Sequence, residues 1–373
     1  MSKDLDQVDV LIVGGGLSGL HTAYELHKQG ISFLLVEARD RFGGRILSYN
    51  AGNSQKEHTE YDSGLAAFDL GPSWFWPGQS NILGLINELG LSADVYMQAG
   101  DGDALYEDSQ GNVQRGIAGV SMAGAYRMQG GMRKIITALS HEVPSKSLAS
   151  NAVVTAIEYK QEKISSTILV NDTIKVISSN FVVLALPPRI ALDSIKFVPQ
   201  FSQTRRDELN AVATWMAGHA KFIAVYKECF WNAAGFSGDV ISHRGPLQEI
   251  HDASSKNGEL NALFGFVSVQ AVHRQQREAE LSSMAIAQLT RLFGELASQP
   301  VEVHLKDWAF DTHTSTKYDQ EILKFHPTND IVNVAESVWG DQLIWSGSES
   351  ANNNNGFLEG ALAASVKTIS CIT

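Results

Sequence analysis

The pattern of hydrophobic and polar residues predicts one strand–helix–strand unit within the first forty positions. Residues 8–13 form a short apolar run that ends in glycines, as is typical of a buried parallel strand. Residues 17–29 carry apolar side chains at helical spacing, and Gly30 stands where a helix C-terminal cap is expected. A second apolar run follows at residues 31–36. This order indicates an α/β fold with a parallel sheet.

The rest of the chain alternates between the two periodicities. Strands are predicted at 181–186, 221–226, 260–269 and 343–345, together with a small antiparallel meander at 153–159, 163–170 and 173–178. Helices are predicted at 82–89, 132–141, 277–293 and 357–369. The polar stretch 48–62 has no periodicity and favours a loop, in which His58 between acidic residues indicates solvated side chains rather than a metal site.

Composition limits the function classes. With 373 residues, the chain is too long for one ordinary core, so two intertwined domains are expected. Its two cysteines, Cys229 and Cys371, exclude a disulfide framework and a cysteine-rich metal site, and they favour a reducing, cytoplasmic setting. A formal net charge of −12 without a basic block makes nucleic acid and anionic membranes poor partners. No apolar run approaches a membrane span, and residues 1–9 do not resemble a signal peptide.

A glycine motif with a physical rationale follows the first predicted strand. Gly14, Gly16 and Gly19 form G-x-G-x-x-G, which allows a tight turn, close approach of a pyrophosphate, and close helix–strand packing. The N–H groups at the start of the next helix then face the phosphates. Glu37 ends the second strand, 18 residues after Gly19, where a carboxylate accepts hydrogen bonds from a ribose and repels the 2′-phosphate of NADP. The sequence therefore predicts a dinucleotide site.

The residues after Glu37 favour FAD over NAD. A second glycine pair, Gly43 and Gly44, again allows close backbone approach, and Arg45 adds a bidentate phosphate clamp. Arg39 can flank the adenosine.

Here the sequence resembles the flavin-containing amine oxidase family, which includes monoamine, polyamine and L-amino-acid oxidases. Similar segments are 37–45, 69–74, 129–132, 183–187, 347–349 and 356–361, in the family's order. The resemblance implies that 69–74 passes along the flavin, that the Val154 backbone holds the adenine, and that Glu349 lies near the ribityl phosphate. The helix beginning near Phe357 would direct its N-terminus at the flavin pyrimidine edge and stabilise the reduced anion. The implied cofactor-binding residues are Gly14, Gly16, Leu17, Ser18, Gly19, Glu37, Ala38, Arg39, Gly43, Gly44, Arg45, Leu70, Gly71, Pro72, Ser73, Trp74, Val154, Ala185, Glu349, Gly356, Phe357 and Leu358.

The resemblance also implies a mixed α/β fold, in which a Rossmann-like FAD-binding domain is interleaved with a substrate domain. Residues 1–76, 129–195 and 311–373 would form the FAD-binding domain. Residues 77–128 and 196–310, which match only diffusely, would form the substrate domain.

Four residues match positions that carry the chemistry in the family. Lys221 resembles the lysine that binds flavin N5 through water and assists reoxidation by O2, and burial should lower its pKa. Trp308 precedes a loop that supplies an active-site aromatic, and the family offset of ten residues gives Tyr318. Tyr318 and Phe357 would form a cage around the amine. The loop 312–316 departs from the family's glycine-rich version.

Two further expectations concern the cofactor bond and the substrate. Monoamine oxidases attach FAD through a cysteine just before the cage tyrosine, where this chain has Lys317, so non-covalent FAD is predicted. Amino-acid oxidases need an arginine for the substrate carboxylate, and Arg115, Arg127 and Arg244 are candidates only by their segments.

The resulting hypothesis is a FAD-dependent oxidase that takes a hydride from the carbon next to a small-molecule amine and yields an imine, then an aldehyde, with O2 as acceptor and hydrogen peroxide as product. Two alternatives stay open. One is a FAD-dependent desaturase or oxidase of a non-amine substrate, and the other is a catalytically degenerate flavin-bound partner module.

Overall fold

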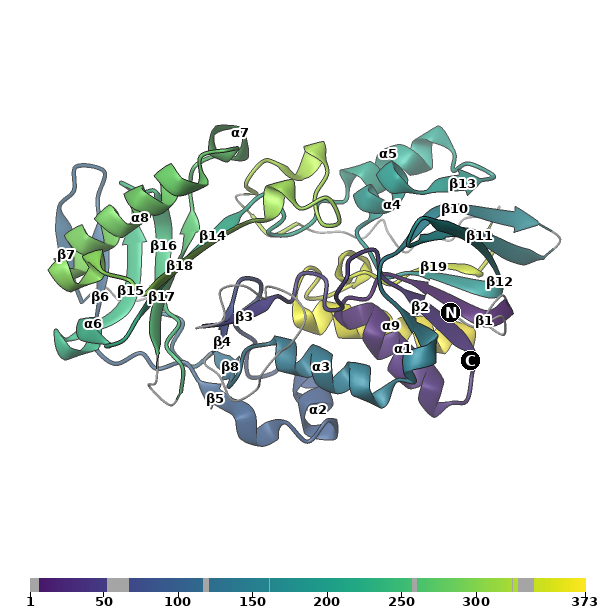
Figure 1. Ribbon diagram of the computed structural model, residues 1–373, viewed down its shortest axis with the longest axis horizontal. Helices are drawn as coiled ribbons and strands as arrows, with labels where there is room; N and C mark the ends of the chain where they lie inside the picture. The colour runs from purple at the N-terminus through teal and green to yellow at the C-terminus, as the bar shows by residue number, and fades with distance from the viewer. Residues whose placement is uncertain are drawn as a thin grey trace.

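The half of the molecule at the right of Figure 1, here called the first half, is built around a sheet whose strands β1, β2, β9, β12 and β19 are parallel. The computed structural model describes residues 7–51, 67–116, 121–160, 162–256, 260–323, 325–327 and 339–373. In this sheet β1 pairs in parallel with β2 and β12, and β19 and β9 add parallel strands at either side. The bounds are β1 (Gln7–Val13), α1 (Leu17–Lys28), β2 (Phe33–Val36), β9 (Leu148–Ala149), β12 (Thr173–Leu184) and β19 (Leu343–Trp345). The predicted strand–helix–strand unit and the mixed α/β fold class are confirmed.

The predicted meander is also confirmed, with one correction. Strands β10 (Ala152–Lys160) and β11 (Lys163–Val170) pair antiparallel with each other, and β11 pairs with β12, while β13 (Lys196–Val198) extends the edge. Two separate strands at 173–178 and 181–186 were expected, but β12 is continuous. Ser178 and Ser179 pair with β1 on one side and β11 on the other, and β19 takes the place of β11 beside residues 182–184, so one strand crosses from the meander into the parallel part of the sheet.

Helices cover both faces of this sheet, because parallel strands bury both faces. Val10 and Ile12 of β1 join the cluster under α1, α2 (Ser80–Glu88), α3 (Arg133–Glu142) and α9 (Leu358–Ile372), which lies below the sheet in Figure 1. Leu11 and Val13 point to the opposite side, toward α4 (Pro188–Ser194) and α5 (Gln203–Ala211). The predicted helices at 82–89, 132–141 and 357–369 are therefore confirmed.

A second, mostly antiparallel sheet forms the other half, in the order β18–β14–β17–β16–β15–β6–β7. Its strands are β6 (Asp103–Glu107), β7 (Val113–Arg115), β14 (Ala220–Tyr226), β15 (Phe236–Ser242), β16 (Leu247–Asp252), β17 (Asn261–Val267) and β18 (Glu302–Asp307). The long helix α8 (Glu278–Phe293) covers one face, with α6 (Phe230–Ala233) at the end and α7 (Ala271–Arg274) before it. The predictions at 221–226, 260–269 and 277–293 are confirmed.

The opposite face of this sheet turns toward the first half of the molecule. Along β14, Phe222, Ala224 and Tyr226 pack under α8, whereas Ile223 and Val225 join a cluster with Leu47, Phe68 and Leu70. Lys221 alternates with Phe222, so its side chain lies on this inner face. The period-2 pattern of one strand thus fixes where its cation points.

Two further sheets contain two strands each. Strand β3 (Ser48–Asn50) pairs with β4 (Ala67–Asp69), and β5 (Val95–Met97) pairs with β8 (Tyr126–Met128). The expectation of a loop from residue 48 is wrong at its start, because Ser48–Asn50 finds a partner strand distant in sequence. The remainder of that loop, with His58, lies outside the described residues. The apolar residues Ile82 and Leu85 of α2 join the cluster under the first sheet, although residues 77–128 were predicted to belong to the substrate domain. The domain boundaries stay a prediction.

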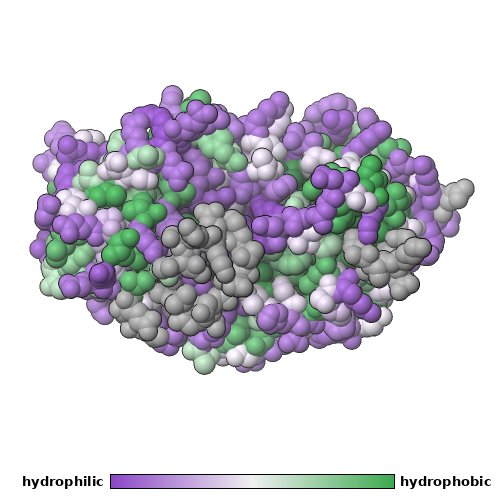
Figure 2. Space-filling model, in the orientation of Figure 1, coloured by the Kyte–Doolittle hydropathy of each residue, from purple (hydrophilic) through white to green (hydrophobic). Residues whose placement is uncertain are grey.

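The distribution of hydrophobic residues on the surface is consistent with hydrophobic cores inside the two halves. On the face in Figure 2, hydrophobic residues show in separate small groups among hydrophilic ones. No helix in the described ranges is long and apolar enough to cross a bilayer.

Candidate active site

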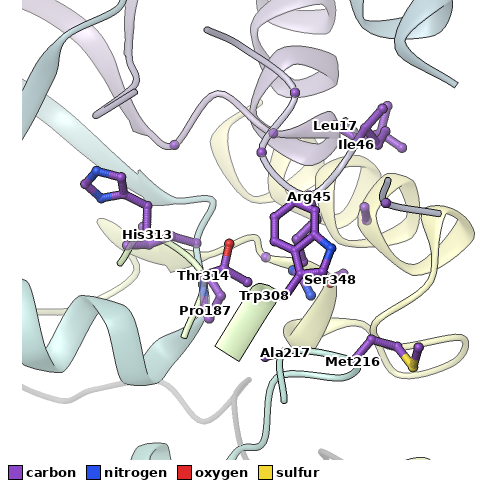
Figure 3. A pocket seen from close by; sticks show the side chains of 18 of the residues that line it. Leu17, Arg45, Ile46, Pro187, Met216, Ala217, Trp308, His313, Thr314 and Ser348 are labelled. Carbon is purple, nitrogen blue, oxygen red and sulfur yellow. Dashed lines mark hydrogen bonds between the residues drawn. The ribbon is translucent and has the colours of Figure 1, made fainter. Parts of the chain in front are cut away.

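A cavity of about 530 Å³ lies between the two sheets, and residues from distant parts of the chain line it. Figure 3 shows part of the wall, with Leu17 at the start of α1, Arg45 after β2, Met216 before β14, and Trp308 and Thr314 after β18. Of the cofactor-binding residues predicted from the sequence, all line the cavity except two, Gly19 and Glu349. Those two lie just behind the wall.

The glycine turn has the tight geometry that its motif predicts. Gly14 has φ +107°, which favours glycine, and a Cβ atom there would lie 2.6 Å from the carbonyl oxygen of Ala185. A Cβ atom on Gly19 would collide with the Gly14 carbonyl, so the close packing of α1 against the turn requires glycine there. Gly16, by contrast, has nothing within 4 Å of its Cβ position and opens into the cavity at the start of α1. This open cradle beside a helix N-terminus fits a pyrophosphate.

Glu37 lies at the cavity wall, and backbone groups orient its carboxylate. Oε2 accepts a hydrogen bond from Gly15 N at 2.7 Å, and Oε1 accepts one from Arg39 N at 2.9 Å. The Arg39 guanidinium donates to Thr314 Oγ1 at 3.0 Å and pairs with Asp311. Arg39 therefore ties the turn after β2 to the loop after β18, across the mouth between the two halves.

Arg45 and Glu349 form an ion pair beside the cavity. Arg45 Nη1 lies 2.7 Å from Glu349 Oε1, and Nη2 donates to Ser348 Oγ at 3.0 Å. Glu349 is 1% exposed, yet neither of its oxygens accepts a hydrogen bond of good geometry from any described residue. Buried carboxylate oxygens need donors, and ribityl or ribose hydroxyls would supply them. Together with the Gly16 cradle, this arrangement fits a flavin dinucleotide.

Lys221 reaches from β14 to the segment that was predicted to pass along the flavin. Its Nζ donates to the Gly71 carbonyl oxygen at 3.0 Å and to Ser73 Oγ at 2.7 Å, and it lies 4.0 Å from the ring centroid of Phe264. Burial lowers the pKa of the Lys221 ammonium to about 7. The Asp69 carboxylate opposes this shift, and the Arg127 guanidinium adds to it. A buried lysine with this pKa can gain or lose a proton near neutral pH.

The C-terminal motif lies at the same wall. Gly356 has φ +78°, and a Cβ atom there would lie 2.6 Å from Trp215 Cβ, so glycine is required. Phe357 is the N-cap residue of α9, and Phe357, Leu358 and Ala361 all line the cavity. The N-terminal end of α9, with its unpaired N–H groups and positive partial charge, therefore lies at the cavity.

Trp308 also lines the cavity, and its indole Nε1 donates to the Leu70 carbonyl oxygen at 3.0 Å. Lys306 lies over its ring at 4.7 Å. The hydrogen bond to Leu70 holds the Trp308 ring against the 69–74 segment.

The prediction that Tyr318 forms an aromatic cage is wrong. Tyr318 is 57% exposed and does not line the cavity. Thr316 and Asp319 form a capping box around the short helix Lys317–Asp319, which holds Tyr318 on the outside. The family offset fails because this loop departs from the glycine-rich version, and Thr312, His313 and Thr314 reach the wall instead.

The sequence did not indicate several residues of the cavity wall. Several of them are aromatic, and the ring centroids of Trp76 and Phe357 lie 5.9 Å apart, edge to face. These residues have no motif, and only Phe266 lies in a predicted strand, 260–269, whose alternation could have indicated an inward-facing side chain. The missed residues include Trp76, Met122, Trp215, Met216, Ala217, His219, Glu249 and Phe266.

His219 is a second titratable group on this wall. Burial lowers the pKa of His219 to about 4, Arg274 adds to the shift, and Glu249 opposes it. Its Nδ1 is buried and has no hydrogen-bond partner among the described residues. The imidazole is therefore neutral at pH 7 and leaves one nitrogen free.

None of the three candidate arginines reaches the cavity. Arg127 donates to the carbonyl oxygens of Ala253 and Ser254 at 2.9 and 3.0 Å. Arg115 pairs with Asp103 at the exposed edge, and Arg244 lies near Gly111. None of these three arginines is therefore placed to hold an amino-acid carboxylate, and the arginines that do line the cavity, Arg39 and Arg45, are those predicted to bind the cofactor. Nor do the described residues contain a cluster of three or more His, Cys, Asp or Glu that could hold a metal ion.

The fold and the site together define a FAD-dependent oxidoreductase. Residues 12–89 match the model of the NAD(P)-binding Rossmann-like domain, and residues 103–368 match that of the flavin containing amine oxidoreductases. The chain belongs to the flavin-containing amine oxidoreductase family, as the sequence resemblance predicted.

Individual relatives cover nearly the whole chain. The "Probable flavin-containing monoamine oxidase A" of Dictyostelium discoideum is 25% identical, covering 95% of this chain and 95% of its own. Human amine oxidase [flavin-containing] B is 22% identical, covering 96% of this chain and 85% of its own. Among solved structures, putrescine oxidase bound to putrescine has a TM-score of 0.79 at 19% identity, covering 98% of both chains. Cyclohexylamine oxidase from Brevibacterium oxydans gives the same TM-score, 0.79, at 19% identity and 98% coverage of both chains. At this identity the structures show a shared fold.

Proposed function

We propose that this protein oxidises a small-molecule amine to an imine, which water then hydrolyses to an aldehyde and ammonia or a smaller amine. Bound flavin would supply the acceptor for the hydride that leaves the carbon next to the amine, and O2 would take up the electrons and yield hydrogen peroxide. The observation that carries the proposal is the buried Lys221, held on the cavity wall against Gly71 and Ser73.

The wall supports binding of the amine in its neutral form. Aromatic side chains line the same cavity as Lys221, among them Trp74, Trp76, Phe266 and Phe357. Such a wall excludes water and disfavours an ammonium ion without a partner. The amine must be neutral, because a protonated nitrogen has no lone pair to assist the loss of hydride. Phe357 and Trp76 would then confine the reacting amine.

The chain's own residues would hold the cofactor along the cavity. Gly14, Gly16 and the start of α1 would take the pyrophosphate, Glu37 a ribose, and Arg45 with Glu349 the ribityl phosphate. Residues 69–74 and the start of α9 would lie along the ring, and Val154 by the adenine. The division into residues 1–76, 129–195 and 311–373 for FAD and 77–128 and 196–310 for the substrate belongs to the same proposal, as do non-covalent attachment and a cytoplasmic setting.

Anaerobic reduction tests the proposal directly. The purified yellow holoenzyme is mixed without oxygen with a panel of amines and amino acids, and the flavin absorbance near 450 nm is followed. We expect at least one amine to bleach the flavin and admission of air to restore it with release of hydrogen peroxide. If no amine bleaches the flavin but a non-amine does, the protein is a desaturase or oxidase of another class. Failure of every substrate would indicate a flavin-bound partner module.

A further inference from the structure

Three residues of the second sheet form one row across the cavity wall. Lys221 of β14 pairs with Phe266 of β17, and Phe266 pairs with Glu249 of β16. Directly paired residues point to the same face, and all three line the cavity. Since neighbouring strands lie roughly 4.8 Å apart, the Cα atoms of Lys221 and Glu249 are about 10 Å apart.

A β-bulge turns Glu249 to this face. Leu247 pairs with Val267, both in the core under α8, but the next paired residue of β16 is Glu249, opposite Phe266. Gln248 is the extra residue, and it is exposed. Without the bulge, Gln248 would face Phe266 and the carboxylate would point away from the cavity.

A buried histidine holds the Glu249 carboxylate in place. His251 Nε2 lies 2.7 Å from Glu249 Oε1, and Nδ1 lies 2.7 Å from Asp239 Oδ1. His251 is fully buried and packs edge-on against Trp74 at 5.1 Å. One imidazole carries at most one positive charge between two carboxylates, so the group as a whole is negative. Glu249 Oε2 has no donor among the described residues, and the Glu249 side chain is 34% exposed.

We infer that Glu249 binds a second, positively charged nitrogen of the substrate, so that the preferred substrates are amines that carry a distal ammonium group. The reacting nitrogen lies at the Lys221 end, the apolar linker crosses Phe266, and the distal ammonium donates to Glu249. The neutral imidazole of His219 stands on the same wall and adds no repelling charge. His251 and Asp239 are positioning residues, because they act through Glu249. This inference rests on the proposed function.

A comparison of two amines that differ only at the distal end tests this inference. Butane-1,4-diamine and butan-1-amine are each mixed anaerobically with the holoenzyme, and the half-saturating concentration for flavin bleaching is measured. We expect the diamine to half-saturate at a concentration at least about tenfold lower. The Glu249→Gln variant keeps an oxygen for His251. In this variant the ratio of the two half-saturating concentrations, monoamine over diamine, should fall to near one. The control Gln248→Ala, at the exposed bulge position, should keep the wild-type ratio.

The outcomes separate the two proposals. If amines bleach the flavin but Glu249→Gln leaves the ratio unchanged, the inference is wrong and the proposed function stands. If neither amine bleaches it, the proposed function fails, and calorimetric titration with butane-1,4-diamine decides the inference. Binding that Glu249→Gln abolishes supports it, and equal binding or none overturns it. Glu249→Asp, which keeps the charge, gives the same comparison if the glutamine variant does not fold.

Discussion

At the scale of single residues, the site depends on polar groups buried at a cost that neighbours offset. Lys221 keeps two acceptors, Gly71 O and Ser73 Oγ, inside an aromatic wall. Removing the partner of a buried polar group costs more than a typical hydrogen bond contributes. A lysine would be an expensive core residue, so its position on the cavity wall indicates a role in the chemistry.

Replacing Lys221 tests that role. In Lys221→Met we expect reoxidation of the dithionite-reduced flavin by O2 to slow by about a hundredfold, because a positioned donor at the reacting centre is lost. Stopped-flow mixing with oxygenated buffer measures this rate. Lys367→Met, which removes an exposed lysine of α9, should keep the wild-type rate. Oxygen reactivity of Lys221→Met equal to that of the control would refute the assigned role.

His251 makes a pH-dependent contribution to stability. Burial favours a lower pKa, but the hydrogen bonds with Asp239 and Glu249 reverse this effect and raise the pKa of His251 above 6.5. Since the folded pKa exceeds the unfolded one, the stabilisation is fully present below about pH 6.5 and is lost as the pH rises through the folded value.

We therefore expect the free energy of unfolding of the wild type, relative to His251→Gln, to fall between pH 6 and pH 9. Denaturant unfolding at several pH values measures this difference. The variant His273→Gln changes an exposed histidine and serves as the control. A difference between wild type and His251→Gln that does not vary with pH, or that grows toward pH 9, would contradict the raised pKa.

Site residues that lie in sequence motifs could be predicted, whereas site residues outside any motif could not. Lys221 and Phe357 could be predicted because each stands in a segment with a recognisable pattern. Tyr318 was predicted from an offset, and a different loop conformation moved it out. Glu249 could not be predicted, because a strand pattern does not reveal a bulge, and without the bulge the same residue faces away.

At the scale of elements, the glycine turn shows how far local sequence determines geometry. The motif predicted both the turn and the direction of α1, because its three glycines have separate steric reasons. Their substitutions should therefore fail in different ways.

We expect Gly19→Ala to destabilise the fold, because the added methyl collides with the Gly14 carbonyl in the turn. Gly16→Ala should keep the fold, since its Cβ meets nothing within 4 Å, but it should weaken flavin binding by about tenfold or more where the pyrophosphate would approach. Thermal unfolding and flavin fluorescence on dilution measure the two effects. Gly84→Ala, in α2 with open space around it, should slightly raise the melting temperature. Equal flavin retention in Gly16→Ala and Gly84→Ala would show that Gly16 is not part of the cradle.

Strand patterns predicted the individual elements better than their partners. The patterns of 221–226 and 260–269 each predict a strand. These patterns do not indicate that β14 and β17 pair, or that their register places Lys221 opposite Phe266. The short strand β3 was expected to be a loop, because its partner β4 lies beyond a long intervening segment. Pairings over such sequence separations depend on packing that no local window contains.

At the scale of the whole molecule, the cavity exists only where the two sheets meet. Ser18 of α1 hydrogen-bonds Ser346 after β19, and Arg39 reaches Thr314, so segments far apart in sequence enclose one space. The order of family-like segments indicated that both ends of the chain share a cofactor. The shape of the substrate wall could not be predicted, because the segments that build it match the family only diffusely.

The position of the thiols supports a prediction about how the cofactor is held. Lys317, which the sequence offset aligns with the attachment cysteine of monoamine oxidases, lies in the short helix outside the cavity. Cys371 is exposed near the end of α9, and Cys229 lies before α6, so neither lines the cavity. Forming a bond to the flavin from either position would require a large movement of the chain.

We therefore expect trichloroacetic acid precipitation of the holoenzyme to release all the yellow colour into the supernatant, as measured by absorbance of both fractions. Flavin that stays with the pellet and fluoresces on a denaturing gel would contradict this, and persistence of that fluorescence in a Cys229→Ser, Cys371→Ser double variant would point to attachment through another side chain.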